Sequence, residues 1–101
     1  MEVNVIKLVT GEEIFGVVEE WDEKKQVATI DNPRVPMQNQ RGISMLPWPM
    51  VSKQTKVFLK MEHIMMVVYP LDQFADMYKE AVTGIVKAPA NALDKTGKII
   101  I

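Results

Sequence analysis

Few side chains in this chain have the types and spacing that catalysis requires. The 101 residues include no cysteine and a single histidine, His63, so thiolate nucleophiles, thiolate metal sites and disulfide bonds are excluded. The sequence pairs no serine with that histidine and contains no glycine-rich phosphate loop. We therefore expect no enzymatic activity, no metal site and no cofactor.

Two pairs of adjacent glutamates are the only other candidates for acid–base chemistry. They are Glu12 with Glu13 and Glu19 with Glu20. Neighbouring residues of a strand point to opposite faces, so the two carboxylates of a pair cannot share a proton. We interpret these glutamates as solvated turn and strand residues.

Charge is unevenly distributed, although the formal net charge is only −1. Residues 1–31 carry eight acidic and three basic side chains, whereas residues 32–61 carry five basic and no acidic ones. A basic segment of this kind can bind anions, including nucleic acid. It can equally fold against the acidic first third and neutralise it, and charge alone favours neither interpretation.

Two single residues could contact a nucleic-acid base. His63 could stack on a base or contact a phosphate, although a lone histidine at the start of a strand is more often a partly buried surface residue. Trp48, between Pro47 and Pro49, could be a stacking platform of the kind that single-strand binders use. Packing against the sheet or a neighbouring subunit is the interpretation that we favour for this tryptophan.

The elements that would position these residues begin with a hairpin over residues 5–22. Apolar residues alternate on both sides of a turn at Gly11, and Gly16 within the second strand allows a sharp bend or a close backbone approach. Residues 26–30 are predicted to form a third strand, stopped at Asp31-Asn32-Pro33 because proline cannot donate to a ladder. An irregular hairpin is expected around Gln40-Arg41-Gly42, with residues 43–50 returning as an edge strand.

The later part of the chain contains two more strands and a helix. Residues 55–59 and 63–69 are predicted to pair with each other. The second of these strands is apolar at nearly every position, so we expect both of its faces to be covered, which in so small a protein favours an oligomer. Apolar residues at helical spacing predict a C-terminal helix at about 71–83, ending at Gly84. The predicted stripe is Leu71, Phe74, Ala75, Met77, Tyr78, Ala81 and Val82.

The chain is interpreted as one domain. Residues 1–85 are expected to form the barrel with its helix, and residues 86–101 a tail that docks on the barrel or on a neighbouring subunit. The start of the sequence has no signal-peptide pattern, and no apolar run approaches the length of about 20 residues that a spanning helix needs. A soluble, cytoplasmic protein is expected.

Two fragments resemble the motifs of the Sm/LSm (Sm-like, Hfq-related) RNA-binding proteins. The first is Ile6-Lys7-Leu8-x-x-Gly11-x-Glu13-x-x-Gly16, with Asp22 six residues further on. The second is Val57-Phe58-Leu59-Lys60-Met61-x-x-Ile64, continuing through Val67 and Val68 to Pro70. Both occur in the family's order, and the match spans about two thirds of the chain. Short sequences of this kind with the helix last also resemble phage-encoded members, which would place the protein in the host cytoplasm.

The resemblance implies a fold, an assembly and a site. The fold is a mainly β, small, strongly bent, five-stranded antiparallel barrel, here with one C-terminal α-helix. The assembly is a closed homo-oligomeric ring of about five to seven subunits that pair their edge strands. The implied site for single-stranded RNA, with DNA as the second choice, places Lys24 at the base-stacking position, Gln26 at the hydrogen-bonding position and Lys60 at the arginine position. Lys25 and His63 lie beside them.

Several residues depart from the family pattern. Lys24 replaces an aromatic residue or histidine, so a stacking platform worth about 1–3 kcal/mol per base is missing. Lys60 lacks the planar fork of arginine, and Met61 replaces a glycine. We therefore expect binding directed at the nucleic-acid backbone. The alternative is a scaffolding ring that keeps the fold without binding nucleic acid.

Overall fold

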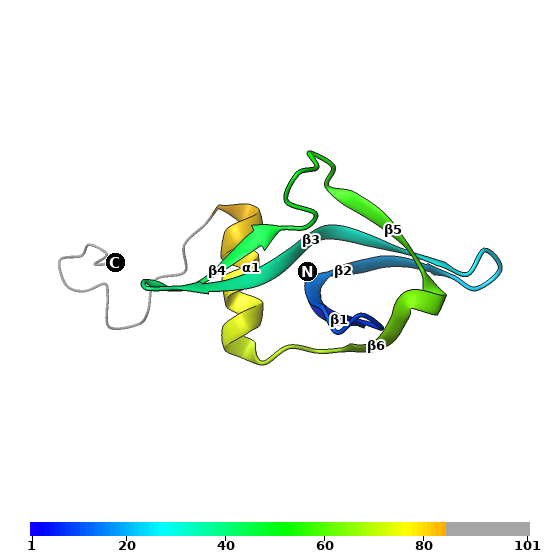
Figure 1. Ribbon diagram of the computed structural model, residues 1–101, viewed down its shortest axis with the longest axis horizontal. Helices are drawn as coiled ribbons and strands as arrows, with labels where there is room; N and C mark the ends of the chain where they lie inside the picture. The colour runs from blue at the N-terminus through cyan, green and yellow to red at the C-terminus, as the bar shows by residue number, and fades with distance from the viewer. Residues whose placement is uncertain (85–101) are drawn as a thin grey trace.

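A computed structural model describes residues 1–84, which form one antiparallel sheet of six strands and one α-helix (Figure 1). In chain order the elements are β1 (Asn4–Leu8), β2 (Glu13–Asp22), β3 (Val27–Asn39), β4 (Gly42–Pro47), β5 (Lys56–Lys60), the 3-10 helix η1 (Met61–His63), β6 (Ile64–Val68) and α1 (Asp72–Thr83). The tail predicted at residues 86–101 lies outside the described residues.

The long strand β3 organises the sheet. Strands are hydrogen-bonded in the order β4-β3-β2-β1-β6, and β5 also pairs with β3. Arg34 of β3 pairs with Phe15 of β2 and with Pro47 of β4, so β4 lies on the edge of β3 that faces away from β2. Within the described residues no pairing links β5 to β6, so the bent sheet stays open. The prediction of a mainly β fold with a C-terminal helix is confirmed. The prediction of a closed, five-stranded barrel is wrong, because the sheet is open and has six strands.

The sheet bends where β2 crosses β3 at Gly16. A Cβ atom on Gly16 would lie 2.6 Å from Cγ2 of Ile30 and 3.3 Å from the carbonyl oxygen of Asp31. The pairing register shifts at the same place, between Phe15 and Val17. The glycine at this position therefore permits the close contact with β3 beside the bulge.

The predicted end of the third strand at Pro33 is wrong, because β3 passes through Pro33 and Pro36. The pairing with β2 skips Asn32 and Pro33, and Asn32 has a φ of 49°. Pro33 therefore lies in a bulge, where its backbone nitrogen does not have to donate a hydrogen bond to β2. Beyond Arg34, β3 pairs only with β4 among the described residues. Edge positions of this kind tolerate a proline, as at Pro36.

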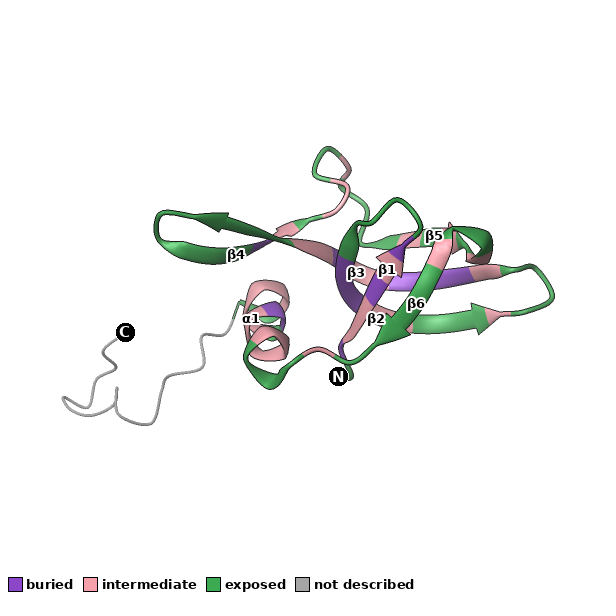
Figure 2. Cartoon of the chain, turned by 60° about the horizontal axis from the view of Figure 1, so that its bottom comes forward, coloured by how far each residue is buried: buried purple, intermediate pink, exposed green. Residues whose placement is uncertain are grey.

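The expected hairpin around Gln40-Arg41-Gly42 is confirmed. Gly42 has a φ of 121°, a conformation that glycine adopts without strain. The returning edge strand is shorter than predicted, since β4 ends at Pro47, and the peptide bond between Trp48 and Pro49 is cis. The β3–β4 hairpin extends away from the bent part of the sheet as an arm (Figure 2).

The strands at 55–59 and 63–69 are present, but the prediction that they pair with each other is wrong. β5 pairs with β3, and β6 pairs with β1. The 3-10 helix η1 turns the chain between them, so each strand continues to a different edge of the bent sheet. Within the described residues β6 is mostly exposed, so a single copy does not cover both of its faces.

Each face of the sheet carries its own apolar cluster. The inner cluster fills the concave side and consists of Ile6, Leu8, Ile14, Ala28 and Ile30. The second cluster lies between the other face and α1 and consists of Val3, Phe15, Met45 and Tyr78. Alternation along β2 supplies both clusters, since Ile14 points to one and Phe15 to the other.

The helix α1 spans Asp72–Thr83 and is followed by Gly84, whose φ is 75°, close to the predicted bounds of about 71–83. Its apolar stripe packs on the second cluster, except for Leu71, which is 66% exposed. Tyr78 is fully buried, and its hydroxyl lies 2.8 Å from the carbonyl oxygen of Asn32 and 3.2 Å from that of Asp31. The helix therefore holds the β3 bulge in place.

We expect Gly16→Ala to lower the free energy of unfolding by about 1–3 kcal/mol, because the added methyl overlaps a side chain that is itself buried. Ile30→Ala removes the opposing Cγ2 atom and alone should cost about 2–5 kcal/mol. The two substitutions should cost less together than the sum of their separate effects, as measured by urea unfolding. Strict additivity would contradict the contact.

We expect the free energy of unfolding to fall between pH 10 and pH 12 in a Tyr78-dependent way. Burial, with a smaller effect of the Asp31 carboxylate, raises the pKa of Tyr78 from 10.0 to about 12. The folded state thus holds the phenol proton more tightly, so this stabilisation is complete below pH 10 and is lost as pH rises through 12. Tyr78→Phe should flatten the decline. Equal pH slopes for the two proteins would contradict the assignment.

Candidate nucleic-acid interface

The turn between β2 and β3 is held by the side chain of Asp22. Its Oδ1 atom accepts hydrogen bonds from the backbone N–H groups of Lys24 (3.0 Å) and Lys25 (3.1 Å). Gln26 has a φ of 57° and donates from Nε2 to the carbonyl oxygen of Glu23 at 2.7 Å. These local bonds satisfy the backbone of the turn, as aspartate commonly does in turns, and leave both lysine side chains exposed.

The loop after β5 meets this turn. Lys60 pairs with Val27 across the β3–β5 ladder, and the N–H of Met61 donates to the carbonyl oxygen of Gln26 at 2.9 Å. The turn and η1 therefore lie side by side at one end of the molecule (Figure 1). Lys24, Lys25, Gln26 and Lys60, which are far apart in the sequence, are brought together there.

His63 lies at the far end of η1. Its carbonyl oxygen accepts a hydrogen bond from the N–H of Val9 at 2.8 Å, which fixes η1 to the turn between β1 and β2. The imidazole is exposed, and its Nε2 atom is 3.9 Å from Oε2 of Glu62, an ion pair only when the histidine is protonated. The residue is thus available at the surface beside Lys60.

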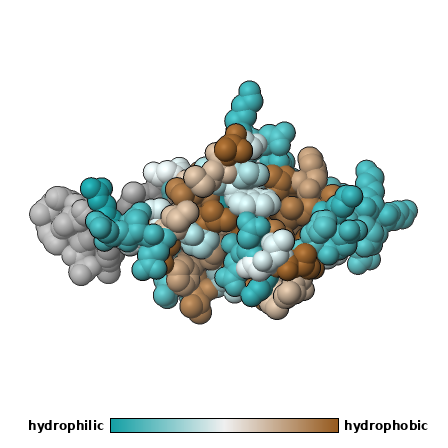
Figure 3. All heavy atoms as spheres, viewed as in Figure 1, coloured by the Kyte–Doolittle hydropathy of each residue, from teal (hydrophilic) through white to brown (hydrophobic). Residues whose placement is uncertain are grey.

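Acidic side chains share the same end of the molecule. Asp22 ends β2, Glu23 belongs to the turn and Glu62 to η1, and Glu20 lines a small hollow together with Lys25. The three lysines there are therefore offset by carboxylates. Figure 3 shows this end, on the right, as hydrophilic. Lysine ammonium groups at this site could bind phosphates, but the overall charge of the site is close to neutral.

Part of the basic segment is neutralised by the acidic first third, as the simpler interpretation of the charge pattern predicts. The Nζ atom of Lys56 lies 2.7 Å from Oε1 of Glu19. This hydrogen bond raises the pKa of Lys56, so the ammonium stays charged and paired. Lys56 is therefore a poor candidate for phosphate binding.

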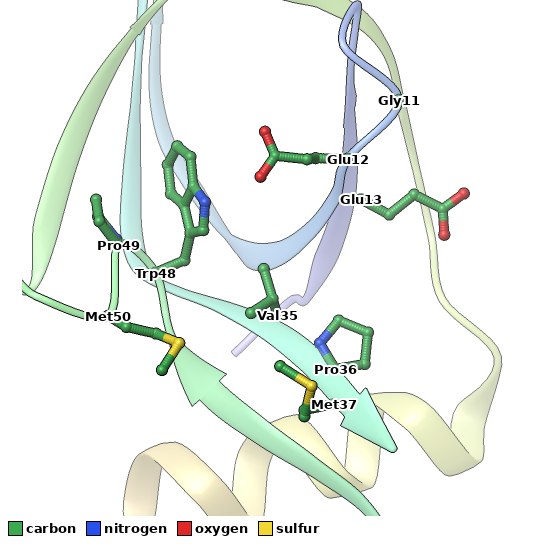
Figure 4. A pocket seen from close by; sticks show the side chains of 9 residues that line it. All are labelled: Gly11, Glu12, Glu13, Val35, Pro36, Met37, Trp48, Pro49 and Met50. Atoms are coloured by element: carbon green, nitrogen blue, oxygen red, sulfur yellow. The ribbon is translucent and has the colours of Figure 1, made fainter. Parts of the chain in front are cut away.

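A groove beside Trp48 was not anticipated from the sequence. Trp48 packs against the inner cluster, as predicted, but it also lines a groove of about 630 Å³ together with Glu12, Met37 and Met50 (Figure 4). The turn between β1 and β2 and the loop after β4 form its sides. Residues so distant in the sequence carried no signal that they would meet.

Other site types find no support in the part of the chain that the structure describes. Residues 1–84 contain no group of three or more histidine, cysteine, aspartate or glutamate side chains that could hold a metal ion. In the same residues no helix is long and apolar enough to cross a membrane.

Comparison with known proteins adds no family. No protein-family model matches this chain, and no curated protein is similar to it in sequence.

We expect Asp22→Ala to loosen the turn that presents Lys24 and Lys25, at a cost of about 1 kcal/mol in the free energy of unfolding. Asp22→Asn keeps an oxygen acceptor and is the matched control. Amide hydrogen exchange should become faster at positions 24 and 25 in the alanine variant only. Unchanged exchange there would contradict the role of the carboxylate.

Proposed function

We propose that the protein is a ring-forming, non-catalytic Sm-like protein that binds single-stranded nucleic acid, with RNA as the preferred ligand, and acts in RNA or DNA processing or regulation. The observation that carries the proposal is the meeting of the β2–β3 turn and the loop after β5. The turn, together with Lys60 at the end of β5 and His63 in η1, carries every residue that was assigned to the ligand.

The arrangement of the two motif-like fragments supports the proposal. The first fragment forms β1, the following turn and the start of β2, and the second forms β5, η1 and β6. Because β1 pairs with β6, fragments separated by some forty residues lie next to each other. The bend at Gly16 and the close fit of Ile30 give the first fragment a physical reason for its glycine.

The side chains at the site favour contact with phosphates over reading of bases. Lys24, Lys25 and Lys60 present ammonium groups, and the turn supplies no aromatic platform. Gln26 already donates from Nε2 to Glu23, although its amide oxygen remains able to accept. Such a site binds the backbone of a single strand with little dependence on base identity.

The proposed ring rests on the exposure of β6. Met65 is 54% exposed, and the three residues that follow it in the strand are exposed as well. β6 pairs only with β1 and β5 only with β3 among the described residues, so each strand keeps one edge unpaired. An apolar strand with an open edge pairs readily with another chain. Pairing β5 of one copy with β6 of the next would bury both edges and repeat around a closed ring.

A scaffolding ring without nucleic-acid binding is the second candidate function. It is favoured by the three carboxylates of Asp22, Glu23 and Glu62, which offset the lysines of each copy. In that case the exposed strands would still assemble the ring, and the lysine-bearing end would only be a solvated surface.

Fluorescence anisotropy with a labelled single-stranded RNA at roughly 50 and 200 mM salt separates the two functions. Binding should weaken steeply with salt, by about 0.7 logarithmic units of affinity per logarithmic unit of salt for each phosphate contacted. Lys24→Ala with Lys60→Ala should lower the affinity and reduce this slope by about 1.4.

Lys53→Ala is the matched control, since Lys53 is exposed in the loop before β5 and lies outside the proposed site. Its affinity and slope should stay near those of the unmodified protein. No binding at the lower salt would leave the scaffold as the function. Binding that is insensitive to Lys24 and Lys60 would place the ligand elsewhere.

A further inference from the structure

The groove beside Trp48 has the composition of a site for a flat ring. Apolar side chains of Val35, Met37, Trp48 and Met50 line it together with two prolines. Its volume is about 630 Å³, and it is open to solvent, so a ligand could lie on its apolar wall without being enclosed. Trp48 is partly buried and packs against the inner cluster, which restrains its indole.

One carboxylate is directed into this groove. Figure 4 shows the side chain of Glu12 pointing toward Trp48, whereas that of Glu13 points away. Glu13 is engaged with Lys7, whose Nζ lies 3.7 Å from its Oε2 atom. Among the described residues, the carboxylate of Glu12 accepts a hydrogen bond from the hydroxyl of Thr10, at 3.2 Å from Oε1, and this leaves both carboxylate oxygens with lone pairs to share.

We propose that this groove binds a guanine base of single-stranded nucleic acid, stacked on Trp48 and hydrogen-bonded to Glu12. Single-stranded bases are commonly recognised by stacking on aromatic side chains and by hydrogen bonds to the Watson–Crick edge. On that edge guanine alone carries two adjacent donors, N1–H and the N2 amino group. A carboxylate, which only accepts, matches both. Adenine, cytosine and uracil each place an acceptor beside their donor and would be repelled at one carboxylate oxygen.

The groove lies close enough to the lysine-bearing end for one strand to reach both. His63 is hydrogen-bonded to Val9, and Gly11 at the rim of the groove is two residues further along the chain. Two residues span at most about 7 Å. The inference rests on the proposed function, because it assigns base selectivity to a single-stranded nucleic acid whose phosphates are bound by Lys60, Lys24 and Lys25.

The test uses Trp48 as its own reporter. Trp21→Phe leaves Trp48 as the single tryptophan of the chain, and its emission is followed during titration with guanosine, adenosine and uridine. Guanosine should quench the emission at about tenfold lower concentration than adenosine. In parallel, a uridine heptamer with one central guanosine should bind more tightly than the same heptamer with a central adenosine.

Glu12→Gln should abolish the preference for guanosine, because its amide nitrogen presents a donor to the donors of the base. Glu13→Gln lines the same groove but should leave the preference intact. Retention of the preference in Glu12→Gln, or no quenching by guanosine, would overturn the proposal. Stronger quenching by an arginine amide than by guanosine would also overturn it and identify a cationic peptide as the occupant.

Failure of this inference can be told apart from failure of the proposed function. If the uridine heptamer binds with a lysine-dependent salt slope while guanosine has no effect, the base site is wrong and the function stands. If guanosine quenches Trp48 through Glu12 while no RNA binds, the groove takes only the free nucleoside, and both the base site for a strand and the lysine-dependent function are wrong.

Discussion

The close packing of β2 on β3 at Gly16 is the constraint on which the rest of the structure depends. A side chain at this position would force Ile30 to move, because its Cγ2 atom and the carbonyl oxygen of Asp31 fill the space. The register shift at this point bends the sheet, and the alternation of side chains along β2 supplies Ile14 to one apolar cluster and Phe15 to the other. A small chain thereby obtains two cores from one sheet, the second of which is covered by α1.

The bend also decides which surfaces meet. β3 continues past it and carries β5 and then β4 along one edge, so the loop after β5 arrives at the β2–β3 turn while the β3–β4 arm extends the other way. Tyr78 closes the arrangement from the helix by donating to the backbone of the bulge. The lysine-bearing end thus lies at the start of β3, before the bend, and the Trp48 groove lies beside the part of β3 that runs beyond it.

Local signals in the sequence were sufficient for most single elements. The 3.6-residue spacing and Gly84 placed α1 correctly, and the alternation around Gly11 placed the first hairpin. Pro33 misled the prediction of β3, since a proline stops a regular ladder but not a bulge, and the bulge is created by Gly16 on another strand. The pairing of β5 with β3 was missed because it depends on the turn at η1 and on long-range packing.

The candidate site, too, could be predicted only in part from the sequence. The Sm resemblance identified Lys24, Lys25, Gln26, Lys60 and His63, and the structure gathers four of them at one end with His63 close by. Asp22 and Glu23 adjoin Lys24 and Lys25 in the sequence, and Glu62 is two residues from Lys60, so those carboxylates could be read from the sequence. That Glu12 would face Trp48 could not, because this juxtaposition comes from tertiary structure.

The exposed, apolar β6 leaves the single copy incomplete, and the proposed ring is what would complete it. Light scattering coupled to size-exclusion chromatography, across a range of protein concentrations, tests this claim most directly. We predict one species with several times the mass of the 11.5 kDa chain. Val67→Lys on β6 should dissociate this species into monomers, whereas Val51→Lys in an exposed loop should leave it intact. A monodisperse monomer at every concentration would contradict it.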